Sequence, residues 1–280
     1  MELLTVLSIV TLLVALIVPA LAQVQRVARG LINVRNQRDI VTAVTLFACD
    51  HDQQFPSSVA LCGDDKRSWS WQDPRKMRTT KPCAWMEHSS VAGYLNAYLS
   101  EAERWSCPSV PEPHPYWQQA WEAADTWDHP RFAGQDALYG SYCLYWNYVG
   151  YQDNGPFRGP TSLYGGPRES TLLVSDYFGY NESCNPKRYG SCEWAGDARI
   201  IASGSLSTSY WSYEASTPSP AGITITLRLN AGYTDGHVER YRPAQTDVMQ
   251  VSEATDGSEP SFPNNASFPG YFFVPRSSSP

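Results

Sequence analysis

The first 25 residues read MELLTVLSIVTLLVALIVPALAQVQ, and the organisation of the rest of the chain follows from them. From Leu3 to Gln25 it has no charged side chain and consists mostly of Leu, Val, Ile and Ala. A helix needs roughly 20 consecutive apolar residues to cross the hydrocarbon core of a bilayer. The sequence therefore predicts an apolar membrane or assembly helix over 1–25, with Glu2 at its start and Pro19 inside it.

Helical periodicity continues past this apolar segment. Apolar residues separated by Arg and Gln recur at helical spacing, at Val24, Val27, Leu31, Val34, Val41, Val44 and Ala48. This pattern predicts that residues 26–52 continue the same helix and lay one face on a globular head. Pro19 removes one backbone donor and is expected to kink or loosen the helix.

The order of Glu2, an aliphatic run, Pro19-Ala20-Leu21 and an Arg-dotted continuation resembles the N-terminal helix of type IV pilins and type II secretion pseudopilins. The resemblance implies that Glu2 neutralises the N-terminal amine of a neighbouring subunit in a filament, and that Pro19 holds the family's proline position. It implies a pilin-like α+β fold, in which the long helix packs on an antiparallel β-sheet head. The implied partners are further copies of this chain, the inner membrane before assembly, the assembly machinery and prepilin peptidase.

The start of the chain leaves two interpretations open. Prepilins carry a short basic leader, so the resemblance leads us to expect a Lys/Arg leader upstream of Glu2. Such a leader would place the head outside, whereas Arg26, Arg29, Arg35 and Arg38 alone favour the cytoplasmic side. Alternatively, Ala20-Leu21-Ala22 before Gln23 fits the cleavage site of a signal peptide. Both interpretations export the rest of the chain.

Composition limits the partners and the compartment. The chain of 280 residues has a formal net charge of -7, which disfavours nucleic acid as a partner. For an exported chain, its seven Cys are expected to form disulfides. Cys184 with Cys192 is the pairing we favour, followed by Cys62 with Cys83 and Cys107 with Cys143, while Cys49 inside the helix pattern is the odd one.

The head is expected to extend over 53–242, with a Trp-rich insertion around 110–138 and a Pro/Ser-rich tail over 243–280. A helix is predicted over 89–104 and a short Trp-rich helix over 117–127. Strands are predicted over 140–151, 170–176, 199–202 and 222–229, and Asp235-Gly236 is typical of a two-residue hairpin turn joining 231–234 to 237–241. The segments SYCLYWNY, TLLVSD and YTDGHVERY resemble, in this order, the heads of planctomycete-type pseudopilins. The tail is expected to be extended.

Two binding hypotheses follow from the head. Trp117, Trp121 and Trp127 are candidates for stacking on glycans, as in an adhesin-like minor pilin. Asp176 and Asp235 both end predicted strands and are candidates for Ca²⁺ binding, which some pseudopilins show in the head.

No nucleophile elbow, P-loop or zinc-protease motif is present in the sequence, so we do not expect an enzyme. The leading hypothesis is a structural subunit of a type IV pilus-like or type II secretion pseudopilus-like filament. Such a subunit resides in the inner membrane before assembly and then in an extracellular or periplasmic filament.

Overall fold

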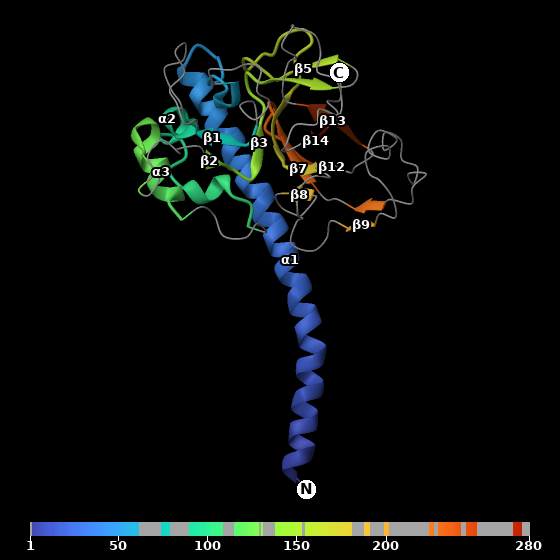
Figure 1. Ribbon diagram of the computed structural model, residues 1–280. Coiled ribbons are helices and arrows are strands. Elements are labelled where there is room, and N and C mark those ends of the chain that lie inside the picture. The colour runs from blue at the N-terminus through green and yellow to red at the C-terminus, as the bar shows by residue number, and fades with distance from the viewer. Residues whose placement is uncertain are drawn as a thin grey trace.

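The computed structural model describes residues 2–61, 74–78, 90–108, 115–128, 130, 138–152, 155–180, 188–190, 199–201, 224–226, 229–241, 245–250 and 271–275. One long helix and two antiparallel sheets dominate it (Figure 1). The predicted α+β class with a long apolar N-terminal helix is therefore confirmed.

Helix α1 (Glu2–Asp50) has 49 residues and continues through Pro19. At 1.5 Å per residue it is about 73 Å long. Its N-terminal part extends away from the head, while its C-terminal part lies against the head (Figure 1). We call residues 3–32 the stalk and residues 33–50 the docked half, because burial begins at Asn33.

The docked half of α1 packs on a four-stranded antiparallel sheet. Its strand order is β12 (Val238–Tyr241), β11 (Leu229–Tyr233), β6 (Leu172–Asp176) and β3 (Tyr142–Leu144). A glycine lets the helix approach β11 closely, since a Cβ on Gly232 would lie 2.7 Å from Val41 Cγ2 and 3.0 Å from Val174 Cγ1. The four strands thus place β6 and β11 directly against the helix.

The β11–β12 hairpin is close to the prediction but differs in its turn. Tyr233 and His237 face each other, with Tyr233 N donating to His237 O at 3.0 Å, so three residues, 234–236, make the connection. Gly236 has φ of 88°, the left-handed conformation that three-residue hairpin loops place at this position. The Asp235-Gly236 signal therefore locates the hairpin correctly, although the two-residue turn is wrong.

A second, six-stranded sheet has the order β5 (Gly155–Arg158), β4 (Val149–Gln152), β13 (Thr246–Gln250), β14 (Tyr271–Pro275), β7 (Phe178–Tyr180) and β8 (Arg188–Gly190). Strands β13 and β14 come from the segment that was expected to be an extended tail. They pair with each other and with β4 and β7, so the tail supplies the centre of this sheet.

Two strand pairs complete the sheets. β1 (Lys76–Arg78) pairs with β2 (Leu138–Tyr139), and β9 (Arg199–Ile201) pairs with β10 (Thr224–Thr226). The strand predicted over 222–229 is thus divided between β10 and the first residue of β11. The strand predicted over 140–151 is divided between β3 and β4.

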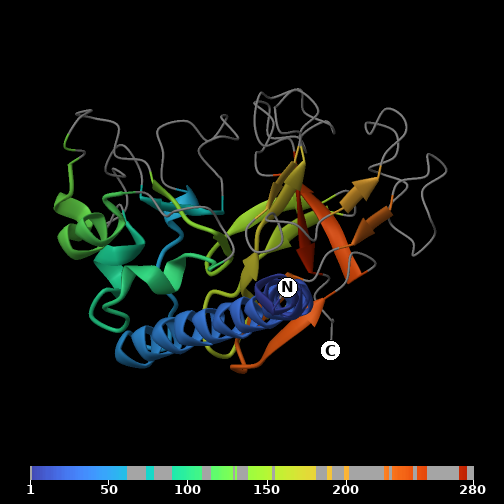
Figure 2. The same ribbon diagram turned by 90° about the horizontal axis from the view of Figure 1, so that it is seen from below.

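Short helices lie on the other side of the docked half, where α2 and η3 contact it directly and the others pack around them, seen from below in Figure 2. They are η1 (Val59–Leu61), α2 (Val91–Leu95), η3 (Ala102–Trp105), α3 (Trp117–Ala123) and η4 (Ala124–Thr126). Ser90 is the N-cap of α2, and its hydroxyl accepts a hydrogen bond from Gly93 N at 3.0 Å. The helix predicted over 89–104 is thus two short helices, α2 and η3.

Candidate functional site

The stalk presents apolar side chains to all sides. Its large apolar residues are between 45% and 76% exposed: Leu3, Leu4, Val6, Leu7, Ile9, Val10, Leu12, Leu13, Val14, Leu16, Ile17, Val18, Leu21, Val24, Val27, Leu31 and Ile32. A helix that is apolar all round belongs in a membrane or inside an assembly. Among the described residues, α1 is the one helix whose length and composition suffice to cross a membrane.

The two residues expected to act in assembly both belong to the stalk helix. Glu2 begins α1, and its side chain lies outside the described residues. Pro19 lies inside the helix, within its exposed apolar segment.

A buried polar junction joins the docked half to the sheet. Asp176, at the end of β6, is fully buried, and its carboxylate accepts hydrogen bonds from side-chain and backbone amide N–H groups. Asn33 Nδ2 lies 3.0 Å from each carboxylate oxygen, and Gln37 Nε2 lies 2.9 Å from Oδ1. The backbone N of Asn230 lies 2.7 Å from Oδ2, and its Nδ2 lies 3.2 Å from the same atom. Helix, β6 and β11 therefore meet at one carboxylate.

Buried phenols extend this junction. Tyr142 OH donates to Asn33 Oδ1 at 2.7 Å, and Tyr241 OH lies 3.4 Å from Asp176 O. Burial raises the pKa of Tyr142 and Tyr241 well above the usual range, so both remain neutral donors. Burial also raises the pKa of Asp176 to about 6, although the amide donors of Asn230, Asn33 and Gln37 oppose this shift.

The junction fixes how α1 is rotated against the head. Apolar packing alone tolerates sliding and rotation, whereas hydrogen bonds from two helical side chains to one carboxylate specify a single orientation. Sequence reasoning singled out Asp176 but missed its partners. The available signal was the placement of Asn33, Asn36 and Gln37 at helical spacing on the face that continues into Ile40 and Val44, which are buried.

The three candidate glycan-binding tryptophans are buried, so this prediction is wrong. Trp117, Trp121 and Trp127 are 8%, 4% and 3% exposed and belong to the hydrophobic core. Trp117 Nε1 donates to Ala102 O at 2.6 Å, and Trp121 Nε1 donates to Leu99 O at 2.9 Å. These side chains anchor the helical insertion to the head and leave no ring face for a sugar.

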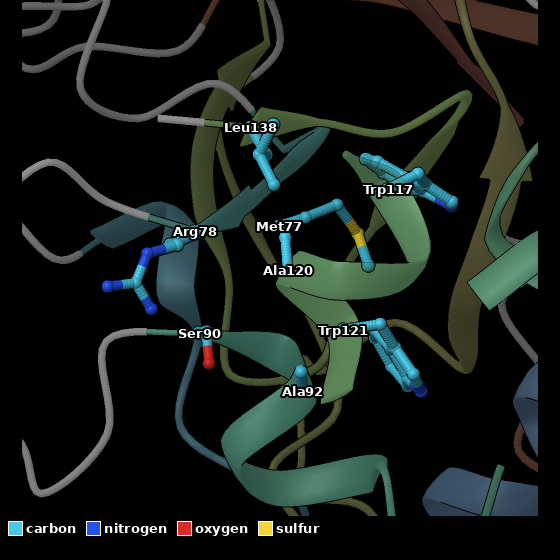
Figure 3. Close-up of a pocket in the computed structure, with 8 residues that line it drawn as sticks. All are labelled: Met77, Arg78, Ser90, Ala92, Trp117, Ala120, Trp121 and Leu138. Atoms are coloured by element: carbon cyan, nitrogen blue, oxygen red, sulfur yellow. The ribbon is translucent and has the colours of Figure 1, made fainter. Parts of the chain in front are cut away.

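A small cavity lies in the same region, between α2, α3 and the β1–β2 pair (Figure 3). Met77, Arg78, Trp117 and Trp121 are among its lining residues, and its volume is about 20 Å³. That volume suits roughly one water molecule, far below the several hundred cubic ångströms typical of ligand pockets. Arg78 beside it donates to the backbone oxygens of Ala124, Asp125 and Trp127 and thereby holds η4 against β1.

The two candidate Ca²⁺ ligands do not converge. Asp176 faces amide N–H donors, which suit an anion and not a cation. Asp235 is exposed in the hairpin turn, where it hydrogen-bonds to the backbone N and ring of His237. Because β11 pairs Ala231 with Ser175 and then runs up to the turn, the two carboxylates lie at opposite ends of the β6–β11 pair. Within the described ranges, no three His, Cys, Asp or Glu side chains are grouped to hold a metal.

The cysteines correct one predicted pairing. Cys107 is disulfide-bonded, but neither Cys143, a buried thiol, nor Cys49, an exposed thiol, is its partner. The expected Cys107–Cys143 bridge is therefore wrong, while Cys49 is the odd residue that the helix pattern predicted. Cys62, Cys83, Cys184 and Cys192 lie outside the described residues.

Comparison of the chain with protein-family models, with curated proteins and with solved structures finds no match in any of the three.

Proposed function

We propose that this protein is a pilin-like structural subunit, held in a membrane by its stalk and then polymerised through it into a type IV pilus-like or type II secretion pseudopilus-like filament. One observation carries the proposal. The exposed apolar stalk is the direct continuation of a helix whose other half is locked into the head by the Asp176 junction. A head attached in this way has a fixed orientation relative to its apolar rod.

A fixed orientation matters for assembly and much less for anchoring. A membrane anchor works through any linker, because lipid does not require a defined angle between helix and head. A helical polymer needs every head to leave the core at the same angle, so that neighbouring heads do not collide. The rigid connection between stalk and head therefore favours polymerisation, with neighbouring stalks replacing lipid around the apolar surface.

The signal-peptide interpretation fits the stalk less well. Cleavage after Ala22 would leave residues 23–32 as a helical extension that contributes nothing to the buried core. Val24, Val27, Leu31 and Ile32 on it would stay between 45% and 67% exposed. Neighbouring stalks in a filament would cover these side chains, whereas a secreted monomer would leave them exposed.

In the proposed filament, Glu2 meets the N-terminal amine of a neighbouring subunit within the apolar core. Leaving that amine unpaired in such surroundings costs about 3–5 kcal/mol. The variant Glu2→Ala is therefore expected to be exported normally while the yield of filaments falls more than about tenfold. The matched control is Asp52→Ala, which removes an exposed carboxylate at the other end of the helix.

The experiment is electron microscopy of the sheared cell-surface fraction, combined with mass spectrometry of the mature N-terminus. Filaments that contain the intact stalk support the proposal. A soluble monomer that begins at Gln23 would overturn it. Wild-type filament yield from Glu2→Ala would remove the role of Glu2 but not that of the stalk.

A further inference from the structure

Two arginines lie directly below the head on the docking face of α1. Arg26 and Arg29 are exposed and follow the last residue of the apolar span. At about 100° per residue, both positions fall within about 40° of Asn33, which is buried against the head. Their side chains therefore leave the helix on the side where the head overhangs the stalk.

A third arginine reaches the same place from the sheet. Arg240 on β12 is exposed, and its Nη2 lies 3.7 Å from the position of a Cβ on Gly30. In the sheet Arg240 is opposite Asn230, which donates to Asp176, so the polar junction fixes this part of β12 against the helix. The blue helix and the orange β11–β12 strands lie side by side in both views (Figures 1 and 2). We call Arg26, Arg29 and Arg240 the arginine corner.

The height of the corner matches the headgroup layer of a bilayer. With the apolar span ending at Gln25, Arg26 and Arg29 lie about 1.5 and 6 Å beyond the hydrocarbon core. The headgroup region extends about 5–8 Å on each side of that core. Arg35 and Arg38 lie about 15 and 20 Å beyond it, which is further than a physiological Debye length of about 8 Å.

We propose that the arginine corner binds the phosphate of an anionic phospholipid and holds its headgroup between the stalk and the underside of the head. Guanidinium groups bind phosphate through two parallel hydrogen bonds, which suits sites that converge from two elements. No acidic residue occurs between Gln25 and Arg38, although the whole chain has a net charge of -7. This stretch of α1 therefore contributes only positive charge, and its height at the headgroup layer favours a lipid over the acidic surface of a second copy.

This inference rests on the membrane-inserted stage of the proposed function and not on the filament. It adds a lipid class and an orientation: the head sits upright on the membrane surface, with one anionic lipid beneath it. The corner would have to release this lipid before the stalk leaves the bilayer.

The test uses the full chain reconstituted in phosphatidylcholine vesicles with and without phosphatidylglycerol. Native mass spectrometry of the extracted protein measures the enrichment of phosphatidylglycerol over phosphatidylcholine. Each arginine near an anionic surface contributes about fivefold, so Arg26→Gln with Arg29→Gln is expected to lower the enrichment about 30-fold, and Arg240→Gln about fivefold. The matched control is Arg35→Gln with Arg38→Gln, which removes the same charge about 180° away from Arg26 and Arg29 and higher on the helix, and is expected to retain the enrichment.

Three results would overturn the corner. Wild-type enrichment in Arg240→Gln would mean that Arg26 and Arg29 act only as ordinary flanking residues of the span. Equal losses in the two double variants would mean that net charge alone is measured. Crosslinking between copies is measured on the same variants. If the corner variants keep the wild-type enrichment but lose this crosslinking, the corner is a subunit contact. Tryptophan fluorescence of each variant verifies that the head is folded, and filaments are scored separately, so a chain that binds the lipid but forms no filament contradicts only the proposed function.

Discussion

The stalk and the docked half belong to one continuous helix, yet they specify their surroundings in opposite ways. The stalk is apolar on every side and exposed, so no single face of it is preferred. The docked half is buried on one face only, and that face begins with the amides of Asn33, Asn36 and Gln37. The comparison shows how a single helix combines an apolar surface without a preferred face with one that fixes a unique orientation of the head.

The same substitution in each half gives the largest expected contrast. Val44 is 0% exposed, so Val44→Arg buries an unpaired charge and is expected to destabilise the head by about 4 kcal/mol or more. Leu13 is 52% exposed in the stalk, so Leu13→Arg is expected to leave the head's stability unchanged and to disfavour membrane insertion by about 3 kcal/mol. Urea unfolding followed by tryptophan fluorescence measures the first effect, and alkaline extraction of membranes measures the second. A destabilised head in Leu13→Arg would show that the stalk contributes to head folding.

Removal of the carboxylate at the junction is the next largest effect. Asp176→Ala leaves the amide donors of Asn33, Gln37 and Asn230 without their buried acceptor, and we expect a loss of about 3–5 kcal/mol in the free energy of unfolding. The control is Asp235→Ala, whose exposed carboxylate should change this free energy by no more than about 0.5 kcal/mol. Equal effects of the two substitutions would mean that the junction contributes no specific stability.

The features that sequence reasoning predicted are those encoded locally. The stalk follows from composition, the docked half from apolar spacing, β6 from a short buried run, and the β11–β12 turn from Asp235-Gly236. Each of these signals lies within a window of a few turns or strand residues. They suffice for the α+β class and for the long apolar helix.

The features that were missed depend on partners far away in the sequence. Asn33 and Asp176 are 143 residues apart, and no local pattern indicates that they meet. Strands β13 and β14 lie in a segment whose composition is typical of irregular chain, and the six-stranded sheet orders them by pairing with β4 and β7. Burial of Trp121 likewise follows from the packing of α3 on η3, because its composition alone fits a core, an interface or a sugar platform equally.

The smallest effect is a pH dependence that distinguishes the two halves, because only the docked half touches a titrating buried group. Burial raises the pKa of Asp176 from 3.8 to about 6. Since the folded-state value is higher, the folded head binds the extra proton more tightly, and this stabilising contribution is complete below about pH 4 and is lost as pH rises through about 6. The difference corresponds to about 3 kcal/mol between those limits.

Hydrogen-bond acceptors for a protonated Asp176 lie close to its carboxyl group. Gln37 Oε1 and Asn230 Oδ1 are buried and have no hydrogen-bond partner within the described part of the chain, and they belong to the amides that already contact the carboxylate. Rotation of either amide would present its oxygen to a protonated Asp176. Urea unfolding of the wild type and of Asp176→Asn across pH 4–7 measures the effect, because the neutral isostere lacks this titration while other groups titrate equally in both. The wild type should lose stability relative to Asp176→Asn as pH rises towards 7; a constant difference between the two would show that Asp176 keeps the same protonation state when the head unfolds.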